Sequence, residues 1–523
     1  MSAPAAAPVH PSPVRYLVLV GAVMIQLILG TVYGYSIFWT PLQAEVFPPI
    51  LTRAEADARI AAGETLGDVT IVADEAAARV LRDQQQGYLK YAFSICILSF
   101  ALVMVVAGRV QDVLGPRIPA LIGGVLMALG FFLASVMNHR IVLLVCHAGL
   151  CAVVALLLIS LVGLLRRRLD PQAAQSEASV PLAVAVLVSV AGVLVGDQYV
   201  GRLAEFDKVA LLWGTIGFLA GAGIGFAYVC PIAALVKWFP TAKGLVSGIA
   251  VAGFGFGAYI IKDPTVGAPP FFRAHGITSF FLVHGLVCLV VVSLGALLLR
   301  NPPGTPPKFT TESSWQETLT RPAFYTLWLM FFSGALAGLM VISIIAEFAK
   351  EQLVAAAGGG AALTSEQLAT LAAKGAAAVG WLAIFNAVGR VFWGLVSDRV
   401  GRTLTFVVMF LFQAGMMFVL ARMNTELSLA VAASIVGFNF GGNFALFPSA
   451  TADLFGARNL GANYGWVFTS YGIAGVFGVA AGNTAKIMTG SYAAAFQLAG
   501  GLCVLSALLA IGLALAHRKA RPA

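Results

Sequence analysis

Charged residues are scarce in this sequence, and their scarcity excludes a soluble globular protein. Asp, Glu, Lys and Arg make up 11% of the 523 residues, hydrophobic residues make up 59%, and the mean hydropathy is +0.90. Soluble domains carry roughly 25% charged residues. Because this chain lacks the polar surface that water requires, we expect an integral membrane protein.

Sequence patterns for catalysis, cofactors and covalent cross-links are missing as well. No P-loop, HExxH, GxSxG or nucleotide fingerprint occurs, so we expect neither an enzyme nor a cofactor nor an ATP-driven pump. The cysteines lie in apolar runs without CxxC spacing, which favours buried thiols over disulfides or metal ligands. They are Cys96, Cys146, Cys151, Cys230, Cys288 and Cys503.

The excess of positive charge does not indicate nucleic-acid binding. The formal net charge is +9, but no basic tract is interleaved with aromatic residues. Lys and Arg collect in the cytoplasmic loops of membrane proteins, which accounts for the excess. The stretch up to Ser12 has no basic n-region or cleavage pattern, so we expect the first apolar run to be retained as a membrane span.

Long apolar runs dominate the sequence. A helix needs about 20 apolar residues to cross a hydrocarbon core of about 30 Å, and only a helix satisfies its own backbone groups within one segment in lipid. We predict about 14 transmembrane helices. The runs lie near 16–40, 88–107, 118–137, 141–165, 180–196, 209–236, 244–261, 276–299, 323–347, 376–397, 404–421, 427–450, 460–484 and 491–516.

An internal repeat divides these runs into two halves. The segment 108–117 recurs 286 residues later as 394–403, whereas Gly, Pro and Phe positions in 225–239 recur about 217 residues later in 442–455. The fall of about 69 residues in the offset predicts an insertion of two helices into the first half. The fold we expect is two six-helix bundles in parallel repeat, enlarged by this insertion.

The predicted organisation follows the repeat. It consists of a cytoplasmic tail (1–15), an N-terminal bundle (16–300) that includes inserted helices (141–207), a proline-rich cytoplasmic linker (301–322), a C-terminal bundle (323–516) and a cytoplasmic tail (517–523). Basic residues favour this orientation moderately, with Arg166–Arg168 as the clearest anchor. Residues 41–87 and 350–375 are expected to be long connections.

The repeated segments share the spacing GxxxDxxG, which resembles the signature loop of the major facilitator superfamily. An acidic residue at a helix end can hold neighbouring helix ends in one conformation, and glycines allow tight turns. We therefore predict a gating motif. Its residues are Gly108, Asp112, Gly115 and Arg117 in the first half, and Gly394, Asp398, Gly401 and Arg402 in the second.

Within that superfamily the chain resembles the oxalate/formate antiporter family, which is related to the monocarboxylate transporters. The resemblance lies in the glycine-rich stretch 221–231, in Lys237-Trp-Phe-Pro240, in 243–255 and in the aromatic first span around Tyr33 and Tyr35. The glycines alone would equally fit close helix packing. The resemblance implies secondary transport of small organic anions, foremost monocarboxylates, by proton symport or anion exchange, in a monomer of the inner (plasma) membrane.

Arg390 is the main candidate for a substrate ligand. It lies eight residues before Asp398, roughly 12 Å from the helix end at 1.5 Å per residue. An arginine at such depth is costly unless it faces a wet cavity and an anion, and its guanidinium can bind a carboxylate through two hydrogen bonds. In the family that the chain resembles, the arginine at this position holds the substrate carboxylate. The alternative is an arginine that snorkels to the membrane surface.

Further candidates surround this position in the expected cavity. The family's oxalate exchanger has a lysine where Tyr471 stands here, so a single cation and a phenol favour a monoanion over oxalate. The other cavity candidates are Tyr33, Tyr35, Tyr228, Asn443 and Phe447. We expect a break in the helix near Asn443. His147 and His284 could relay protons, although each could equally be a hydrogen-bonded core residue.

Three other functions are alternatives to this one. An oxalate/formate-type exchanger of dicarboxylates would use the same fold. A membrane sensor without transport activity would need a large soluble output domain, which the chain lacks. A carrier of cations or drugs would need an acidic residue deep in the cavity, and Glu347, the nearest candidate, lies at a helix end.

Overall fold

The computed structural model describes most of the chain. The described residues are 13–145, 147–149, 151, scattered positions between 187 and 198, 204–263, 265, 267–303, 312–358 and 363–519. The predicted inserted spans 141–165 and 180–196 lie largely outside them, as do Arg166–Arg168, most of the two predicted tails and residues 304–311 of the linker.

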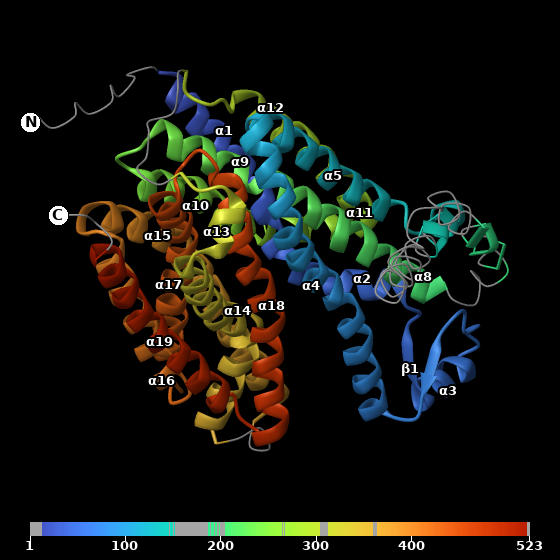
Figure 1. The fold of residues 1–523 in the computed structure, drawn as a ribbon. Coiled ribbons are helices and arrows are strands. Elements are labelled where there is room, and N and C mark those ends of the chain that lie inside the picture. The colour runs from blue at the N-terminus through green and yellow to red at the C-terminus, as the bar shows by residue number, and fades with distance from the viewer. Residues whose placement is uncertain are drawn as a thin grey trace, which may run out of the picture.

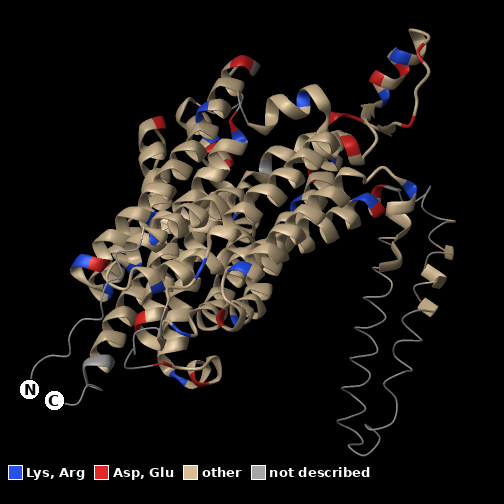
Figure 2. Ribbon diagram, turned by 90° about the horizontal axis from the view of Figure 1, so that it is seen from above, with Lys and Arg blue, Asp and Glu red and all other residues tan. Residues whose placement is uncertain are grey.

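Twelve helices of the described residues are long and apolar enough to cross a membrane. They coincide with twelve of the predicted runs, so the expected fold of two helical bundles is confirmed. In Figure 1 the first half of the chain, blue to green, and the second half, yellow to red, form two groups of helices. Figure 2 shows charged residues mostly at helix ends and in connections, with long uncharged stretches between them.

The first half begins with α1 (Val14–Leu29), which continues as the 3₁₀-helix η1 (Gly30–Phe38). Its further elements are α2 (Trp39–Val46), β1 (Ile50–Thr52), α3 (Arg53–Ala61), β2 (Thr70–Val72), α4 (Glu75–Leu114), α5 (Arg117–Ser135), α8 (Ala204–Leu212), the π-helix η3 (Trp213–Ala220), α9 (Gly221–Trp238), α10 (Lys243–Lys262), α11 (Ala268–His275) and α12 (Ile277–Leu298). Strands β1 and β2 pair in parallel, with Ile50 opposite Thr70.

The second half is entirely helical within the described residues. Its elements are α13 (Trp315–Thr320), α14 (Pro322–Ala356), α15 (Ser365–Val400), α16 (Arg402–Leu420), α17 (Glu426–Phe455), α18 (Leu460–Thr489) and α19 (Ala493–Lys519).

The connections predicted at 41–87 and 350–375 are shorter than expected, because the helices continue past the apolar runs. α4 begins at Glu75, where Asp74 caps the helix by accepting a hydrogen bond from the backbone N–H of Ala77 at 2.8 Å. α15 begins at Ser365 behind a capping box formed by Thr364 and Gln367. Hydropathy reports only the part of a helix that lies in lipid, so it misses these polar first turns.

The two halves meet along two helix pairs, α4 with α18 and α10 with α15. In the repeat these pairs are equivalent, because α4 corresponds to α15 and α10 to α18. The residues singled out by the sequence lie on or beside these four helices and on η1, so the interface between the halves holds the candidate site.

Candidate functional site

Arg390 lies in the middle of α15 and is completely buried. Its Nε donates to the side-chain oxygen of Asn386 at 2.9 Å, and Nη1 donates to the backbone oxygen of Val251 on α10. Nη2 is buried without a hydrogen-bond partner, and no carboxylate of the described residues pairs with this guanidinium. The side chain therefore does not snorkel to the membrane surface, and one edge of its fork is free to bind a ligand.

Aromatic rings from both halves enclose this guanidinium. Its Cζ lies 4.6 Å from the ring centroid of Phe444 on α17 and 5.6 Å from that of Phe254 on α10. Ring faces attract cations, and the attraction is stronger where water is excluded. The rings therefore stabilise the buried charge without neutralising it, which preserves its attraction for an anion.

Four tyrosines lie within electrostatic reach of Arg390. They are Tyr228, Tyr33, Tyr471 and Tyr464. The hydroxyls of Tyr33 and Tyr471 share a hydrogen bond that joins η1 to α18, and thus one half of the protein to the other. The hydroxyls of Tyr228 and Tyr464 are buried and make no hydrogen bond of normal geometry. The cluster therefore presents several unsatisfied polar atoms beside one cation.

Of the tyrosines that the sequence analysis named as candidates, the structure brings Tyr33, Tyr228 and Tyr471 close to Arg390, but not Tyr35. The Tyr35 ring points into the N-terminal bundle, where it stacks on Phe93 at 6.2 Å and meets Phe38 edge to face. The two tyrosines diverge because residues two apart on a helix point to nearly opposite sides, on the 3₁₀-helix η1 as on an α-helix.

Asn443 and Phe447 also turn away from the guanidinium. The amide of Asn443 lies against Gly334 of α14, and the ring of Phe447 stacks on Phe331 of α14 at 4.4 Å. The helix break expected near Asn443 is wrong, because α17 runs without interruption from Glu426 to Phe455. Gly441 and Gly442 instead allow close packing: a Cβ on Gly441 would lie 2.1 Å from the backbone oxygen of Asn386.

Sequence reasoning missed four residues of the cluster. Asn386 precedes Arg390 by one helical turn, so helical spacing could have predicted their hydrogen bond. Phe254 lies 217 residues before Tyr471, so the repeat offset could have pointed to it. Phe444 and Tyr464 carry no comparable signal, because nothing in the sequence distinguishes them from packing aromatics.

The two motif aspartates each receive two backbone N–H groups from the opposite half. Asp112, near the end of α4, accepts from Gly461 and Ala462 at 3.1 and 2.8 Å. Asp398, near the end of α15, accepts from Gly244 and Leu245 at 2.9 and 2.8 Å. Each carboxylate thereby caps the first turn of α18 or α10, where the helix dipole favours negative charge. We call these the Asp112 contact and the Asp398 contact.

The motif glycines play two different parts. Gly115 and Gly401 have φ of 82° and 93° and end α4 and α15 with the turn that the sequence predicted. Gly108 and Gly394, in contrast, lie inside their helices. A Cβ on Gly108 would lie 2.0 Å from the backbone oxygen of Gly461, and one on Gly394 would lie 2.2 Å from that of Gly244. These two glycines therefore permit close approach of the halves rather than turns.

The two motif arginines are not equivalent. Arg402 pairs with Asp398 at 2.8 Å and with Asp453 at 2.9 Å, and Asp453 in turn pairs with Lys243 of the other half at 2.6 Å. Arg117 donates instead to the backbone oxygen of Leu299, within its own half, at 2.6 Å. Arg117 therefore takes no part in joining the two halves.

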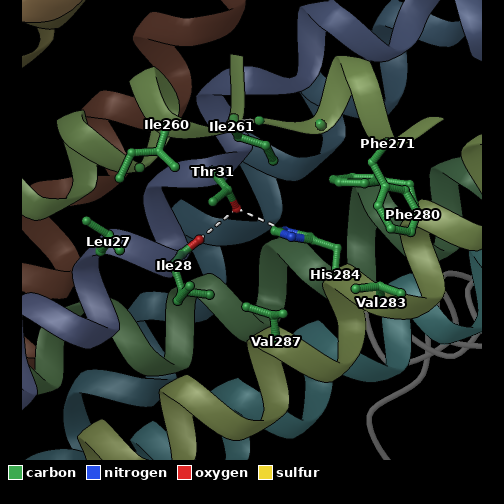
Figure 3. A pocket seen from close by; sticks show the side chains of 13 residues that line it. Leu27, Ile28, Thr31, Ile260, Ile261, Phe271, Phe280, Val283, His284 and Val287 are labelled. Carbon is green, nitrogen blue, oxygen red and sulfur yellow. Dashed lines mark hydrogen bonds between the residues drawn. The ribbon is translucent and has the colours of Figure 1, made fainter. Parts of the chain in front are cut away.

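The two histidines lie apart from the Arg390 cluster. His284 forms a hydrogen bond with Thr31 at 3.1 Å, packs against Phe131 and Phe280, and lines a mainly apolar cavity of about 270 Å³ between α1, α10, α11 and α12 (Figure 3). His147 lies 3.5 Å from Asp207. For His284 the geometry is that of a hydrogen-bonded core residue.

Glu347, the acidic residue considered for a cation carrier, does not reach the site. Its carboxylate is exposed and pairs with Lys350 at 3.3 Å on the same helix. The buried cluster around Arg390 thus has a cation and hydroxyls but no acidic group of the described residues, which is the arrangement expected for binding an anion.

The comparisons with known proteins agree with this picture. A family model described as Major Facilitator Superfamily matches residues 353–523. The chain is 24% identical to an uncharacterized MFS-type transporter, YhjX, of Escherichia coli, over 88% of this chain and 86% of that protein. It is 30% identical to the oxalate:formate antiporter of Oxalobacter formigenes, over 55% of this chain and 65% of that protein.

The fold is also that of a solved transporter. The Escherichia coli fucose:proton symporter FucP superposes with a TM-score of 0.56 at 11% identity, over 95% of this chain and 98% of that one. The helices, the repeat and these matches lead to one conclusion: the chain has the fold of the major facilitator transporters, and its residues 353–523 match the model of that superfamily.

Proposed function

We propose that the protein is a secondary carrier of small monocarboxylates in which Arg390 binds the carboxylate. The observation that carries this proposal is the buried guanidinium between the two halves, with Nη2 unpartnered and no carboxylate of the described residues beside it. A buried charge without a counter-ion is costly, and an anionic ligand removes that cost. The similarity to an oxalate:formate antiporter supports small carboxylates as the class of substrate.

The arrangement around Arg390 fits a monoanion better than a dianion. One cation faces the site, and the neighbouring groups are phenols, which donate hydrogen bonds without charge. Tyr228 and Tyr464 have hydroxyls to offer to a second polar atom of the substrate. A dianion would bring one uncompensated negative charge into a site of low polarity.

Alternating access would follow from the contacts between the halves. The Asp112 and Asp398 contacts lie at the same end of the molecule and hold it closed there. When both break, the halves can rock apart at this end and expose Arg390 from that side. We assign this end to the cytoplasm because its connections carry Arg109, Arg117, Lys237 and Arg399, as the positive-inside rule expects.

The energy source is either a proton that accompanies the substrate or a second anion that is exchanged for it. Uptake of labelled carboxylates into proteoliposomes distinguishes the two. Symport requires a pH gradient of the correct sign, whereas exchange requires a carboxylate inside the vesicles and proceeds without a gradient.

The decisive experiment compares Arg390→Ala and Arg390→Lys with wild type, with Arg422→Ala as a matched control at a position outside the cluster. Lysine keeps the charge but loses the planar fork. Because a hydrogen bond to a charged group contributes about 1.5–3 kcal/mol, we expect Arg390→Lys to bind at least about tenfold more weakly and Arg390→Ala to lose counterflow. Wild-type affinity in monodisperse Arg390→Ala protein would refute the proposal.

The rival function, exchange of dicarboxylates, has its own test. Tyr471→Lys would add a second cation beside Arg390, and charge matching should then raise the preference for dicarboxylates over monocarboxylates. If wild-type protein already prefers oxalate to formate or acetate, the rival is correct. An unchanged ratio in Tyr471→Lys would remove Tyr471 from the substrate site.

A further inference from the structure

One face of α10 follows the boundary between the two halves. A Cβ on Gly244 would lie 2.4 Å from the backbone oxygen of Gly394, one on Gly248 would lie 2.3 Å from that of Arg390, and one on Gly255 would lie 3.2 Å from the Cβ of Ala387. Val251, between them, accepts the hydrogen bond from Arg390. The spacing of four, three and four residues is that of a helix face packed along a neighbouring helix.

The next two positions of this face are Ala258 and Lys262. Ala258 is buried, and Lys262 is the last residue of α10. At 1.5 Å per residue, Lys262 lies about 16 Å from Val251 along the helix, on the side away from the Asp398 contact. This face of α10 therefore contacts Arg390 near its middle, at Val251, and has a second cation, Lys262, at its end.

Lys262 differs from three other lysines at this end of the molecule in forming no ion pair within the described part of the chain. Lys350, Lys374 and Lys486 each pair with a glutamate, at 3.3, 2.9 and 2.6 Å. Lys262 is partly buried and makes no ion pair or hydrogen bond with a described residue, and its Cγ lies 3.9 Å from where a Cβ on Gly34 would stand. The stem of Lys262 thus lies beside the helix that carries Tyr33, and no described carboxylate pairs with its ammonium.

We propose that Lys262 is an outer binding site for small carboxylates, where an anion is held before it reaches Arg390. The proposal rests on the proposed function. A partly desolvated ammonium on a flexible stem attracts anions and raises their local concentration. Lysines also stabilise helix C-termini by interacting with the last carbonyls, a role that needs no substrate. The two roles make different predictions for the direction of transport.

The test compares Lys262→Gln, Lys262→Arg and the matched control Lys486→Gln, which removes the same charge from the last turn of α18. Initial rates are measured at low ionic strength for substrate offered to the Lys262 end and, separately, to the opposite end. We expect Lys262→Gln to raise KM at least about threefold from the Lys262 end only, without changing the maximal rate. Lys262→Arg and Lys486→Gln should resemble wild type.

Ionic strength gives a second measurement, because salt screens an exposed charge. The difference in KM between wild type and Lys262→Gln should shrink as salt rises. An unchanged KM in Lys262→Gln, an equal change from both ends, or a failure of Lys262→Arg to preserve affinity would each refute the outer site. Loss of counterflow in Arg390→Ala together with an unchanged Lys262→Gln would refute this inference alone. Normal transport by Arg390→Ala would refute the proposed function.

Discussion

The Asp112 contact and the Asp398 contact occupy equivalent places in the repeat, yet only one of them has an ion-pair network. Both carboxylates accept two backbone N–H groups from the opposite half. Asp398 also pairs with Arg402, which connects through Asp453 to Lys243. Asp112 feels the charges of Lys237 and Arg109 without forming an ion pair with either.

Sequence positions explain this difference. The position equivalent to Arg402 is Pro116, and the position equivalent to Asp453 is Lys237, so the first half has neither a guanidinium nor a carboxylate for a network. The repeat thus preserves the contacts made by the backbone, whereas the side chains that reinforce them have diverged. We therefore expect replacement of the motif glycines to weaken the two contacts equally. Replacement of a charged residue should weaken the Asp398 contact more than the Asp112 contact.

Separation of the two halves at the end where the Asp112 and Asp398 contacts lie can be followed with a single reporter cysteine. A cysteine in place of Ser247, which is buried one turn from Gly244, reports opening through its rate of labelling by a hydrophilic maleimide. The native cysteines are replaced by serine in this background. Faster labelling means that the halves are apart more of the time.

The largest effect is expected from Gly108→Ala and Gly394→Ala. The added Cβ would lie within about 2 Å of a backbone oxygen of the other half, and backbone cannot give way as a side chain can. Each substitution should disfavour the closed state by about 3 kcal/mol or more and speed labelling at least about 100-fold. Gly415→Ala, with open space around it, is the control. Normal labelling in either variant would show that the glycine contact does not hold the halves together.

The second-largest expected effect distinguishes the Asp398 contact from the Asp112 contact. Asp112→Asn and Asp398→Asn both replace charge-assisted hydrogen bonds by neutral ones. We expect each substitution to destabilise the closed state by about 2 kcal/mol. Asp398→Asn also loses its ion pair with Arg402, so we expect it to label roughly fivefold faster than Asp112→Asn. Equal rates would mean that the network adds nothing to the Asp398 contact.

The smallest effect is expected from Asp453→Asn, which leaves the Asp398 hydrogen bonds intact. It removes one partner of Lys243 and one partner of Arg402. Since Asp453 is partly exposed, we expect the closed state to lose at most about 1 kcal/mol of stability. This effect should vanish at about 1 M salt, because the Debye length then falls to about 3 Å. A salt-independent effect would show that Asp453 acts through packing instead of charge.

The sequence predicted the spans better than the site. The twelve predicted runs that can be compared coincide with helices, and the repeat placed Asp112 and Asp398 at equivalent helix ends. It could not distinguish Tyr33 from Tyr35, because helical spacing puts them on opposite sides and only the packing of η1 decides which side faces Arg390. It also gave Asn443 a role at a helix break that does not exist.

Whether a segment enters the membrane was determined by the sequence itself, because the transfer of a helix into lipid depends on the residues of that helix alone. The cost of burying Arg390 is local in the same way, so its position within an apolar helix was enough to single it out. Which groups surround it was decided only by the tertiary structure. Phe254, Phe444 and Tyr464 meet Arg390 from three other helices, and contacts between segments so far apart depend on how the two halves pack.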